Sequence, residues 1–426
     1  MAGISPAGAT AAARQATIRD ANLRLVLSTV LSSPEPVSRA GVAVATALTR
    51  STVSRLADDL VAAGLVDELE PVRASVRGRP GTPLVAGRDL AALGLQVNPG
   101  FCAVRVVDLG GRVVDERLVT EDFVGSDPKA TLRRIAAVAR RVRRSLPPRL
   151  RLVGAGLALP GVVSVEDARV LSAPNLGWSE VDVASVLGPR VLGGLPLRVA
   201  NEADLAARTV TEPLPGRPGP LSDFVYVSGE VGIGGAAVVG GRVFAGRHGW
   251  AGEIGHVAVD PDGPACPCGS TGCLEQYAGR RAMLRTARLP DDAPMELLAE
   301  RVRSGDRAAR ESVDSAARAL GVALSSVLNV LDISTVVLGG HLAKAAELIR
   351  PSLEEHLQQR VISAPWLRPV VEVAARDDAA GATGAAFAVL DAVIDHPAGW
   401  VDSSGGTLSA PRSPGSPLRA SAHGGR

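Results

Sequence analysis

The sequence has few aromatic residues, almost no net charge and no long hydrophobic run. Phe, Trp and Tyr make up 3% of its 426 residues, so any core must consist mainly of Ala, Val and Leu. The formal net charge of +2 gives no overall electrostatic attraction to nucleic acid. The most apolar stretch, 322–338, is interrupted by Ser325, Ser326, Asn329 and Asp332. Residues 1–13 lack the basic start and apolar run of a signal peptide. We expect a globular protein of two or three domains with no membrane partner.

Cysteine is also rare, with four residues, yet Cys266, Cys268 and Cys273 share one short loop that follows His256. One imidazole and three thiolates form a closed tetrahedral set that suits structural zinc. The alternatives are a disulfide with a spare thiol, or three ordinary buried cysteines. Cys266 and Cys268 are too close to bridge comfortably, and an odd number argues against a disulfide framework. We therefore predict that these four residues bind zinc. Because the thiols would then be committed to a metal, we also predict that the protein is located in the reducing cytoplasm.

The first part of the chain has the pattern of three helices followed by a hairpin. Apolar residues recur at helical spacing over 17–32, and Pro34 and Pro36 end that helix. A short second helix is predicted over 38–48. The third begins after Thr49, a suitable N-cap, and stops at Gly64. Residues 65–85 have the composition of a β-hairpin wing.

The polar face of the third helix predicts contact with DNA. It carries Arg50, Ser51, Thr52, Ser54 and Arg55 near its N-terminus, where a recognition helix meets bases and phosphates. Arg77 and Arg79 flank Gly78 at the tip of the wing, which is slim enough to enter a minor groove. Alternatively, the apolar faces of these helices are those of any small helical unit. Arg77 and Arg79 would then belong to an ordinary solvated loop. The order of these features favours a winged helix-turn-helix that binds double-stranded DNA.

A resemblance to a known family appears at the cysteine loop. Ala-Gly-Glu-Ile-Gly-His at 251–256, followed by C-x-C-G-x-x-G-C-x-E, resembles the signature of the ROK family (repressor, open reading frame, kinase). The resemblance extends over about 17–393. It implies a two-lobed, actin-like ATPase (sugar kinase-like) body with a zinc loop. It also implies that Glu253, His256 and Glu275 face a bound sugar. The family's regulators carry a winged-helix head, which its kinases lack.

Two further segments resemble sugar-binding elements of the family. Asn175 lies in a segment that resembles the family segment whose asparagine contacts the sugar. An asparagine that only caps a turn is an equal alternative role for this residue. Asn201-Glu202-Ala-Asp204 resembles an Asn-Asp-x-Asn element, in which the asparagine binds a hydroxyl and the aspartate is the catalytic base. Glu202 is one methylene longer than that base, so sugar binding survives more easily than catalysis.

Both phosphate loops of the family's kinases are altered. The first is an Asp-x-Gly-Gly-Thr turn, and here residues 96–100 lack the aspartate, the threonine and one glycine, while Pro99 removes an amide donor. The second, around Gly232, is preceded by Glu230-Val231 in place of Gly-Thr, and a carboxylate there would repel phosphate. The resemblance therefore implies that kinase chemistry is lost.

The sequence thus predicts an α/β protein with four segments: a disordered leader (1–16), a winged helix-turn-helix (17–88), a ROK sugar kinase-like effector body of two lobes (89–395) and a disordered tail (396–426). The predicted function is a sugar-responsive transcriptional regulator, a repressor of carbohydrate metabolism genes. Its partners would be an operator and a sugar or sugar phosphate, and it would act as a homodimer or dimer of dimers. The alternatives are an active ATP-dependent sugar kinase with a DNA-binding head, and a body that docks a protein partner instead of a sugar.

Overall fold

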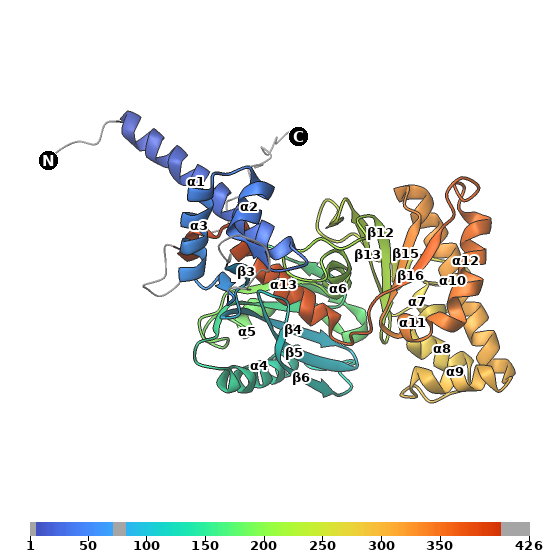
Figure 1. Ribbon diagram of the computed structural model, residues 1–426. Helices are drawn as coiled ribbons and strands as arrows, with labels where there is room; N and C mark the ends of the chain where they lie inside the picture. Colours follow the sequence, from blue (N-terminus) through green and yellow to red (C-terminus); the bar gives the residue numbers. More distant parts are fainter. Residues whose placement is uncertain (1–5, 71–81, 402–426) are drawn as a thin grey trace, which may run out of the picture.

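The body has two lobes whose central sheets repeat one strand arrangement (Figure 1). The computed structural model describes residues 6–70 and 82–401. The first sheet has the order β11-β7-β4-β5-β6, from β4 (Leu90–Asn98), β5 (Phe101–Asp108), β6 (Val113–Thr120), β7 (Arg151–Leu159) and β11 (Leu197–Asn201). The second has the order β14-β13-β12-β15-β16, from β12 (Phe224–Gly229), β13 (Ile233–Val239), β14 (Arg242–Val243), β15 (Thr335–Gly339) and β16 (Val370–Val373). Each combines an antiparallel meander with two parallel strands.

Helices cover both faces of the first sheet, which explains why β4 and β5 are buried along their whole length. Alternate residues of β4, such as Leu93 and Leu95, pack towards α4 (Pro128–Ser145). The other face meets α13 (Ala380–Asp395) so closely that a β-carbon at Gly94 would lie 1.9 Å from the carbonyl oxygen of Ala382. A small sheet of β8 (Val162–Ser164), β9 (Arg169–Ala173) and β10 (Trp178–Asp182) adjoins this lobe, with η1 (Pro174–Leu176) and α5 (Val183–Val186).

The second sheet lies between a helical layer and α6 (Glu202–Thr211), which also packs on α13. The layer consists of α7 (Glu275–Ala278), α8 (Arg280–Thr286), α9 (Met295–Arg303), α10 (Arg307–Leu331), α11 (Gly340–Lys344) and α12 (Ala346–Arg360). Figure 1 shows α6 between the two sheets. The N-terminus of α6 therefore faces the space between the lobes.

The head has the arrangement expected of a winged helix. It contains α1 (Pro6–Ser32), α2 (Arg39–Thr46), α3 (Arg50–Ala62) and an antiparallel sheet of β1 (Val37–Ser38), β3 (Pro83–Ala86) and β2 (Val66–Glu68), in that order. The predicted start and end of α3 are confirmed. Thr49 Oγ1 accepts a hydrogen bond of 3.2 Å from the amide of Thr52, and Gly64 has a φ of 74° just after the C-cap.

Two segment boundaries differ from the sequence-based expectation. Helix α1 begins at Pro6, so residues 6–16 of the expected leader are helical; this stretch is rich in alanine, the strongest helix former. The expected tail from 396 includes α14 (Ala398–Val401). Ala398, Trp400 and Val401 pack against the head core, and the amide of Ala398 donates to Asp20 Oδ1 at 3.2 Å. Residues 1–5 and 402–426 lie outside the described residues.

The head and the first lobe share one hydrophobic core. Leu23 and Leu27 of α1 belong to the same buried cluster as Phe387 and Val393 of α13. Only residues 87–89 separate β3 of the wing from β4 of the body. In the described part of the chain, no helix is both long enough and apolar enough to cross a lipid bilayer. The head is therefore packed on the body and not merely tethered to it.

Candidate effector and metal sites

The predicted zinc ligands lie together. The ligand atoms of His256, Cys266, Cys268 and Cys273 are all within 4.8 Å of one another. Cys268 Sγ is 3.7 Å from Cys273 Sγ, and Cys266 Sγ is 3.8 Å from His256 Nδ1. Tetrahedral zinc with Zn–S bonds of about 2.3 Å would set its sulfur ligands about 3.8 Å apart. The cysteines are free thiols, so the disulfide alternative is wrong. The cluster can hold a metal ion.

The loop that carries these ligands folds tightly because of two glycines. Gly269 and Gly272 have φ angles of 95° and 62°, which residues with a β-carbon rarely adopt. A β-carbon at Gly272 would lie 1.5 Å from the carbonyl oxygen of Asp260. The loop starts from η2 (Ile254–His256) and ends at α7. It therefore connects the metal cluster with the two glutamates, Glu253 and Glu275, that flank it in the sequence.

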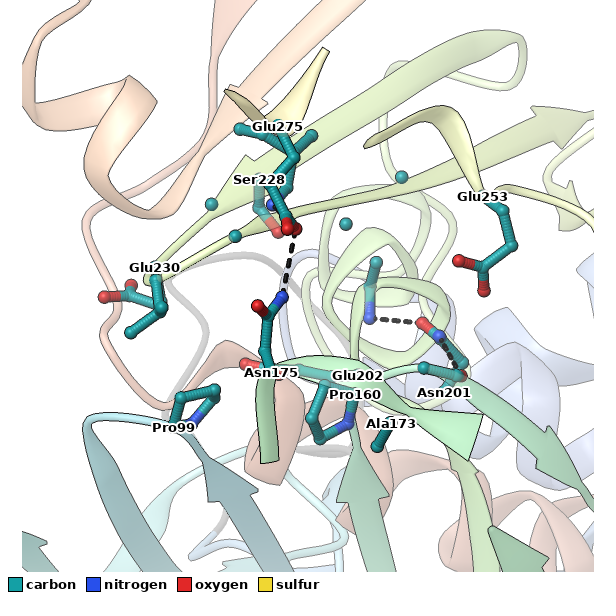
Figure 2. A pocket seen from close by; sticks show the side chains of 18 of the residues that line it. Pro99, Pro160, Ala173, Asn175, Asn201, Glu202, Ser228, Glu230, Glu253 and Glu275 are labelled. Atoms are coloured by element: carbon teal, nitrogen blue, oxygen red, sulfur yellow. Dashed lines mark hydrogen bonds between the residues drawn. The ribbon is translucent and has the colours of Figure 1, made fainter. Parts of the chain in front are cut away.

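A pocket lies between the lobes (Figure 2). The first lobe contributes residues 98–99, 160–161, 173–175 and 201–203, and the second contributes 228–235, 252–253, 256 and 275. All six residues predicted to bind a sugar line it: Asn175, Asn201, Glu202, Glu253, His256 and Glu275. The chain positions that resemble a sugar site thus converge on one cavity.

Asn201 and Glu202 are held by the structure around the start of α6. Asn201 Oδ1 caps α6, accepting from the amides of Ala203 at 2.7 Å and Asp204 at 3.3 Å, and its Nδ2 donates to the carbonyl of Gly161 at 2.9 Å. Glu202 Oε1 accepts hydrogen bonds from two side chains of β4, Gln96 Nε2 and Asn98 Nδ2, both at 2.7 Å. Burial raises the pKa of Glu202, while these two hydrogen bonds oppose the shift.

Asn175 and Glu275 meet across the pocket from different lobes. Asn175 Nδ2 donates to Glu275 Oε2 at 3.0 Å, as the dashed line in Figure 2 shows. The same carboxylate oxygen accepts a hydrogen bond of 3.1 Å from the amide of Ile233. The Glu275 side chain is buried, at 5% exposure. This pair bridges the two lobes at one wall of the cavity.

Glu253 reaches the pocket next to His256. Its Oε2 lies 3.9 Å from His256 Nε2, while His256 Nδ1 faces the sulfur of Cys266. Burial raises the pKa of Glu253, and the imidazole acts in the opposite direction. One imidazole ring therefore lies between the pocket and the sulfur atoms of the Cys/His cluster.

The loop at 96–100 uses its polar groups internally. Gln96 Oε1 accepts from the amide of Ala382 at 2.9 Å, in addition to the bond from its Nε2 to Glu202. The amide of Gly100 donates to Asn98 Oδ1 at 3.1 Å, and Pro99 has no amide hydrogen. These groups are therefore not presented to a phosphate.

Glu230 lies at the end of β12, on the pocket lining. Burial, together with the negative charge of Glu202, raises the pKa of Glu230 to about 7, although Lys344 and Arg280 act in the opposite direction. Lys344 pairs with Asp378 at 2.8 Å. A carboxyl group thus stands where the resemblance implied a phosphate loop.

Helix α3 presents the residues predicted to contact DNA at its first turns. Arg50, Ser51 and Arg55 are exposed, while Thr52 and Ser54 are half-buried. Ser51 and Thr52 hydroxyls lie 3.0 and 2.8 Å from Thr49 Oγ1. Arg77 and Arg79 lie outside the described residues.

Gln96, Asn98 and Arg217 have structural roles that were not predicted from the sequence. Gln96 and Asn98 interrupt an otherwise apolar strand, and that interruption was the available signal. Arg217 donates to the carbonyls of Leu31, at 3.3 Å, and Ser33, and so joins the body to the end of α1. Nothing in its loop sequence indicates this contact, because its partners lie far away in the chain.

Comparison with known proteins agrees with this geometry. The model of the ROK family matches residues 102–392, most of the body. The chain belongs to the ROK family. The xylose repressor of Caldicellulosiruptor bescii is 26% identical over 397 residues, which cover 89% of this ROK chain and 98% of that repressor. The Escherichia coli DNA-binding transcriptional dual regulator NagC is 25% identical over 343 residues, covering 77% of this chain and 82% of its own.

Solved structures of both ROK classes share the fold. A ROK family transcriptional regulator, a homologue of the Escherichia coli MLC protein, has a TM-score of 0.72 at 23% identity and is matched over 91% of this chain and 98% of its own. A ROK family glucokinase from Streptomyces griseus, solved with glucose and AMPPNP, has a TM-score of 0.59 at 28% identity. That match covers 70% of this chain and 98% of the glucokinase. The regulator thus matches more of this ROK protein than the kinase does.

Proposed function

We propose that this ROK protein is a sugar-responsive transcriptional repressor of carbohydrate metabolism genes. The observation that carries the proposal is the packing of a winged-helix head directly on a body with a pocket of carboxyl and amide groups between its lobes. Relatives named as repressors match almost the whole chain, while the glucokinase matches a smaller share. Sensing and DNA binding would then reside in one chain.

The head supplies the DNA contacts. The exposed Arg50 and Arg55 would read base edges from the major groove, and Ser51, Thr52 and Ser54 would reach phosphates or flanking bases. Arg77 and Arg79 would extend the contact into the minor groove. Two heads of a homodimer, or of a dimer of dimers, would bind two half-sites of an operator. We expect the protein to work in the cytoplasm because its DNA partner lies there.

The pocket would bind the effector sugar through hydroxyl groups. Carboxylates, amide side chains and imidazoles pair well with hydroxyls, and six such groups meet here: Asn175, Asn201, Glu202, Glu253, His256 and Glu275. Because residues of both lobes line the cavity, a bound sugar would favour one relative position of the lobes. That difference in affinity would shift the spacing of the heads in the dimer.

His256, Cys266, Cys268 and Cys273 would hold a structural zinc ion. Three thiolates and an imidazole suit zinc, and the spacing of their ligand atoms fits tetrahedral coordination. Zinc would supply rigidity, fixing the loop that carries His256 and ends at Glu275. The four side chains leave no ligand position for a reacting water, which supports a structural role.

We further propose that the protein is not an enzyme. Pro99 and the internally bonded amide of Gly100 leave the first loop without donors for phosphate, and Glu230 opposes phosphate at the second. Glu202 also accepts two hydrogen bonds through one oxygen, which holds it as an acceptor and not as a free base. These features support loss of the kinase activity and speak against the kinase alternative.

The test is a titration of operator DNA with the full-length protein, with and without sugars, in which fluorescence anisotropy measures DNA binding. A sugar that weakens operator binding by tenfold or more, without affecting scrambled DNA, would support the proposal. Sequence-specific DNA binding that no sugar changes would contradict the effector part and favour a body that docks a protein partner.

A further inference from the structure

The pocket between the lobes has carboxyl groups on several sides. Among its described lining residues are four glutamates, Glu202, Glu230, Glu253 and Glu275, and neither a lysine nor an arginine. Figure 2 shows Glu230 and Glu253 on opposite sides of the cavity, with Glu275 and Asn175 between them. A ligand in this cavity would therefore meet carboxyl groups in more than one direction.

The two cations that act on Glu230 are engaged elsewhere. Lys344 influences Glu230 but pairs with Asp378 at 2.8 Å, and Arg280 donates to the carbonyl of Ala293 at 2.9 Å. Neither lines the pocket. A phosphate ester would thus enter without a positive side chain to balance its charge.

Several backbone amides around the cavity are also committed. The amide of Glu230 donates to the carbonyl of Gly232 at 3.2 Å, that of Ile233 donates to Glu275, and that of Gly100 donates to Asn98. The first amides of α6, from Ala203 and Asp204, donate to the Asn201 cap. The helix N-terminus that points into the pocket is therefore already capped, and it is not available to an anion.

These features distinguish two kinds of sugar. A phosphate monoester carries a charge of about −1.5 to −2 near neutral pH and needs cations or amide donors. The hydroxyls of an uncharged sugar are donors, and carboxylate oxygens accept them in short, charge-assisted hydrogen bonds. The lining has four carboxyl groups as acceptors and neither a lysine nor an arginine as a charged donor.

We propose that the effector is a sugar without a phosphate or other negatively charged group, and that Glu230 is the residue that discriminates against the phosphate ester. The inference rests on the proposed sugar-responsive function and names the chemical class of its ligand. Glu230 has this role because it lines the pocket directly after β12, where the lining has no lysine or arginine to balance its charge.

The test compares matched pairs of ligands on the full-length protein. Thermal shift and calorimetry would measure xylose, glucose and N-acetylglucosamine, each against its terminal phosphate ester. We expect one free sugar to bind, and its ester to bind roughly 100-fold more weakly or worse, because like charges at close range repel strongly in a poorly screened cavity. An ester that binds as tightly as its free sugar, or more tightly, would overturn the inference while leaving the proposed function intact. If no sugar of either kind bound, the proposed function itself would fail, and the inference with it.

Glu230→Gln tests the role of the single residue, with the exposed Glu166→Gln as the matched control. The ratio between the Kd of the ester and that of the free sugar should fall about tenfold in Glu230→Gln and stay unchanged in the control. An unchanged ratio in a Glu230→Gln protein that melts at the wild-type temperature would remove Glu230 from this role. If that variant failed to fold, the comparison of ligand pairs on the wild-type protein would still decide the ligand class.

Discussion

Glu253 and His256 face each other where the pocket meets the Cys/His cluster, with Glu253 Oε2 3.9 Å from His256 Nε2. The other ring nitrogen, Nδ1, lies 3.8 Å from Cys266 Sγ. A histidine that ligates a metal through one nitrogen commonly has its other nitrogen oriented by a carboxylate. A ligand that engages Glu253 would therefore act on a ring that also faces the Cys/His cluster.

The first prediction concerns the metal. Purified protein should contain about one zinc per chain, and Cys268→Ser should lose it together with stability and the response to sugar. Cys102→Ser is the matched control, because Cys102 is a buried thiol in β5, outside the cluster. Elemental analysis and thermal melts would measure both. A chelated, metal-free protein that remained folded and responsive to sugar would contradict the structural role.

The second prediction concerns the two groups of arginines in the head. Arg55→Ala should cost roughly 1–3 kcal/mol on the operator and relax the preference at one base position. Arg79→Ala should weaken all duplexes more evenly and reduce the salt dependence by about one counterion. Arg141→Ala, an exposed change on α4, is the control. Anisotropy titrations at several salt concentrations, on operator and scrambled DNA, would separate these outcomes. If neither head variant altered DNA affinity, the head would not be a DNA reader.

The third prediction is the absence of phosphoryl transfer. With ATP, magnesium and any sugar that binds, the protein should form no sugar phosphate, since Glu230 and the internally bonded loop at 96–100 cannot hold the nucleotide phosphates. A coupled assay for ADP would measure this. Turnover on the order of 1 per second or faster would establish the kinase alternative.

The fourth prediction concerns the junction between head and body. Arg217→Ala removes hydrogen bonds from a guanidinium to the carbonyls of Leu31 and Ser33, and should lower the free energy of unfolding by about 1–3 kcal/mol. The exposed Arg190→Ala should change it by less than about 0.5 kcal/mol. Urea denaturation would compare the two. Equal stability of both variants would mean that Arg217 does not secure the head.

The fifth prediction is a dependence of stability on pH. Burial, and next the charge of Glu253, raise the pKa of Asp204 to about 7. Between roughly pH 4 and 7 the folded protein thus holds a proton that the unfolded chain has released, so the contribution of Asp204 to stability falls as the pH rises through this range. Asp204→Asn should therefore stabilise the protein by about 1–3 kcal/mol at pH 8 and much less at pH 4. Melts of this variant across pH, beside Asp314→Asn on an exposed face of α10, would reveal a difference that grows with pH. A constant difference would show that Asp204 is not the group responsible.

Local sequence determined much of this protein. The four potential ligands lie in one short segment, from His256 to Cys273, and glycines at its turns let it fold so that they come together. Thr49 and Gly64 fixed the ends of α3, since capping depends only on neighbouring residues. The apolar runs at 90–98 and 101–108 form strands that are buried along their whole length. The family resemblance then placed the sugar-binding candidates, and all of them line one pocket.

Tertiary structure decided what those residues contact. Glu202 is held by Gln96 and Asn98, which precede it by 106 and 104 residues, and Arg217 reaches carbonyls more than 180 residues away. No local pattern encodes such pairs, because they depend on how strands and helices from distant parts of the chain pack. The same holds for the head: its α1 stripe indicated a buried face, but only the packed structure shows that α13 of the body covers part of it. Periodicity in a sequence identifies which face of a helix is buried. Only the complete fold determines which other surface packs against that face and removes it from water.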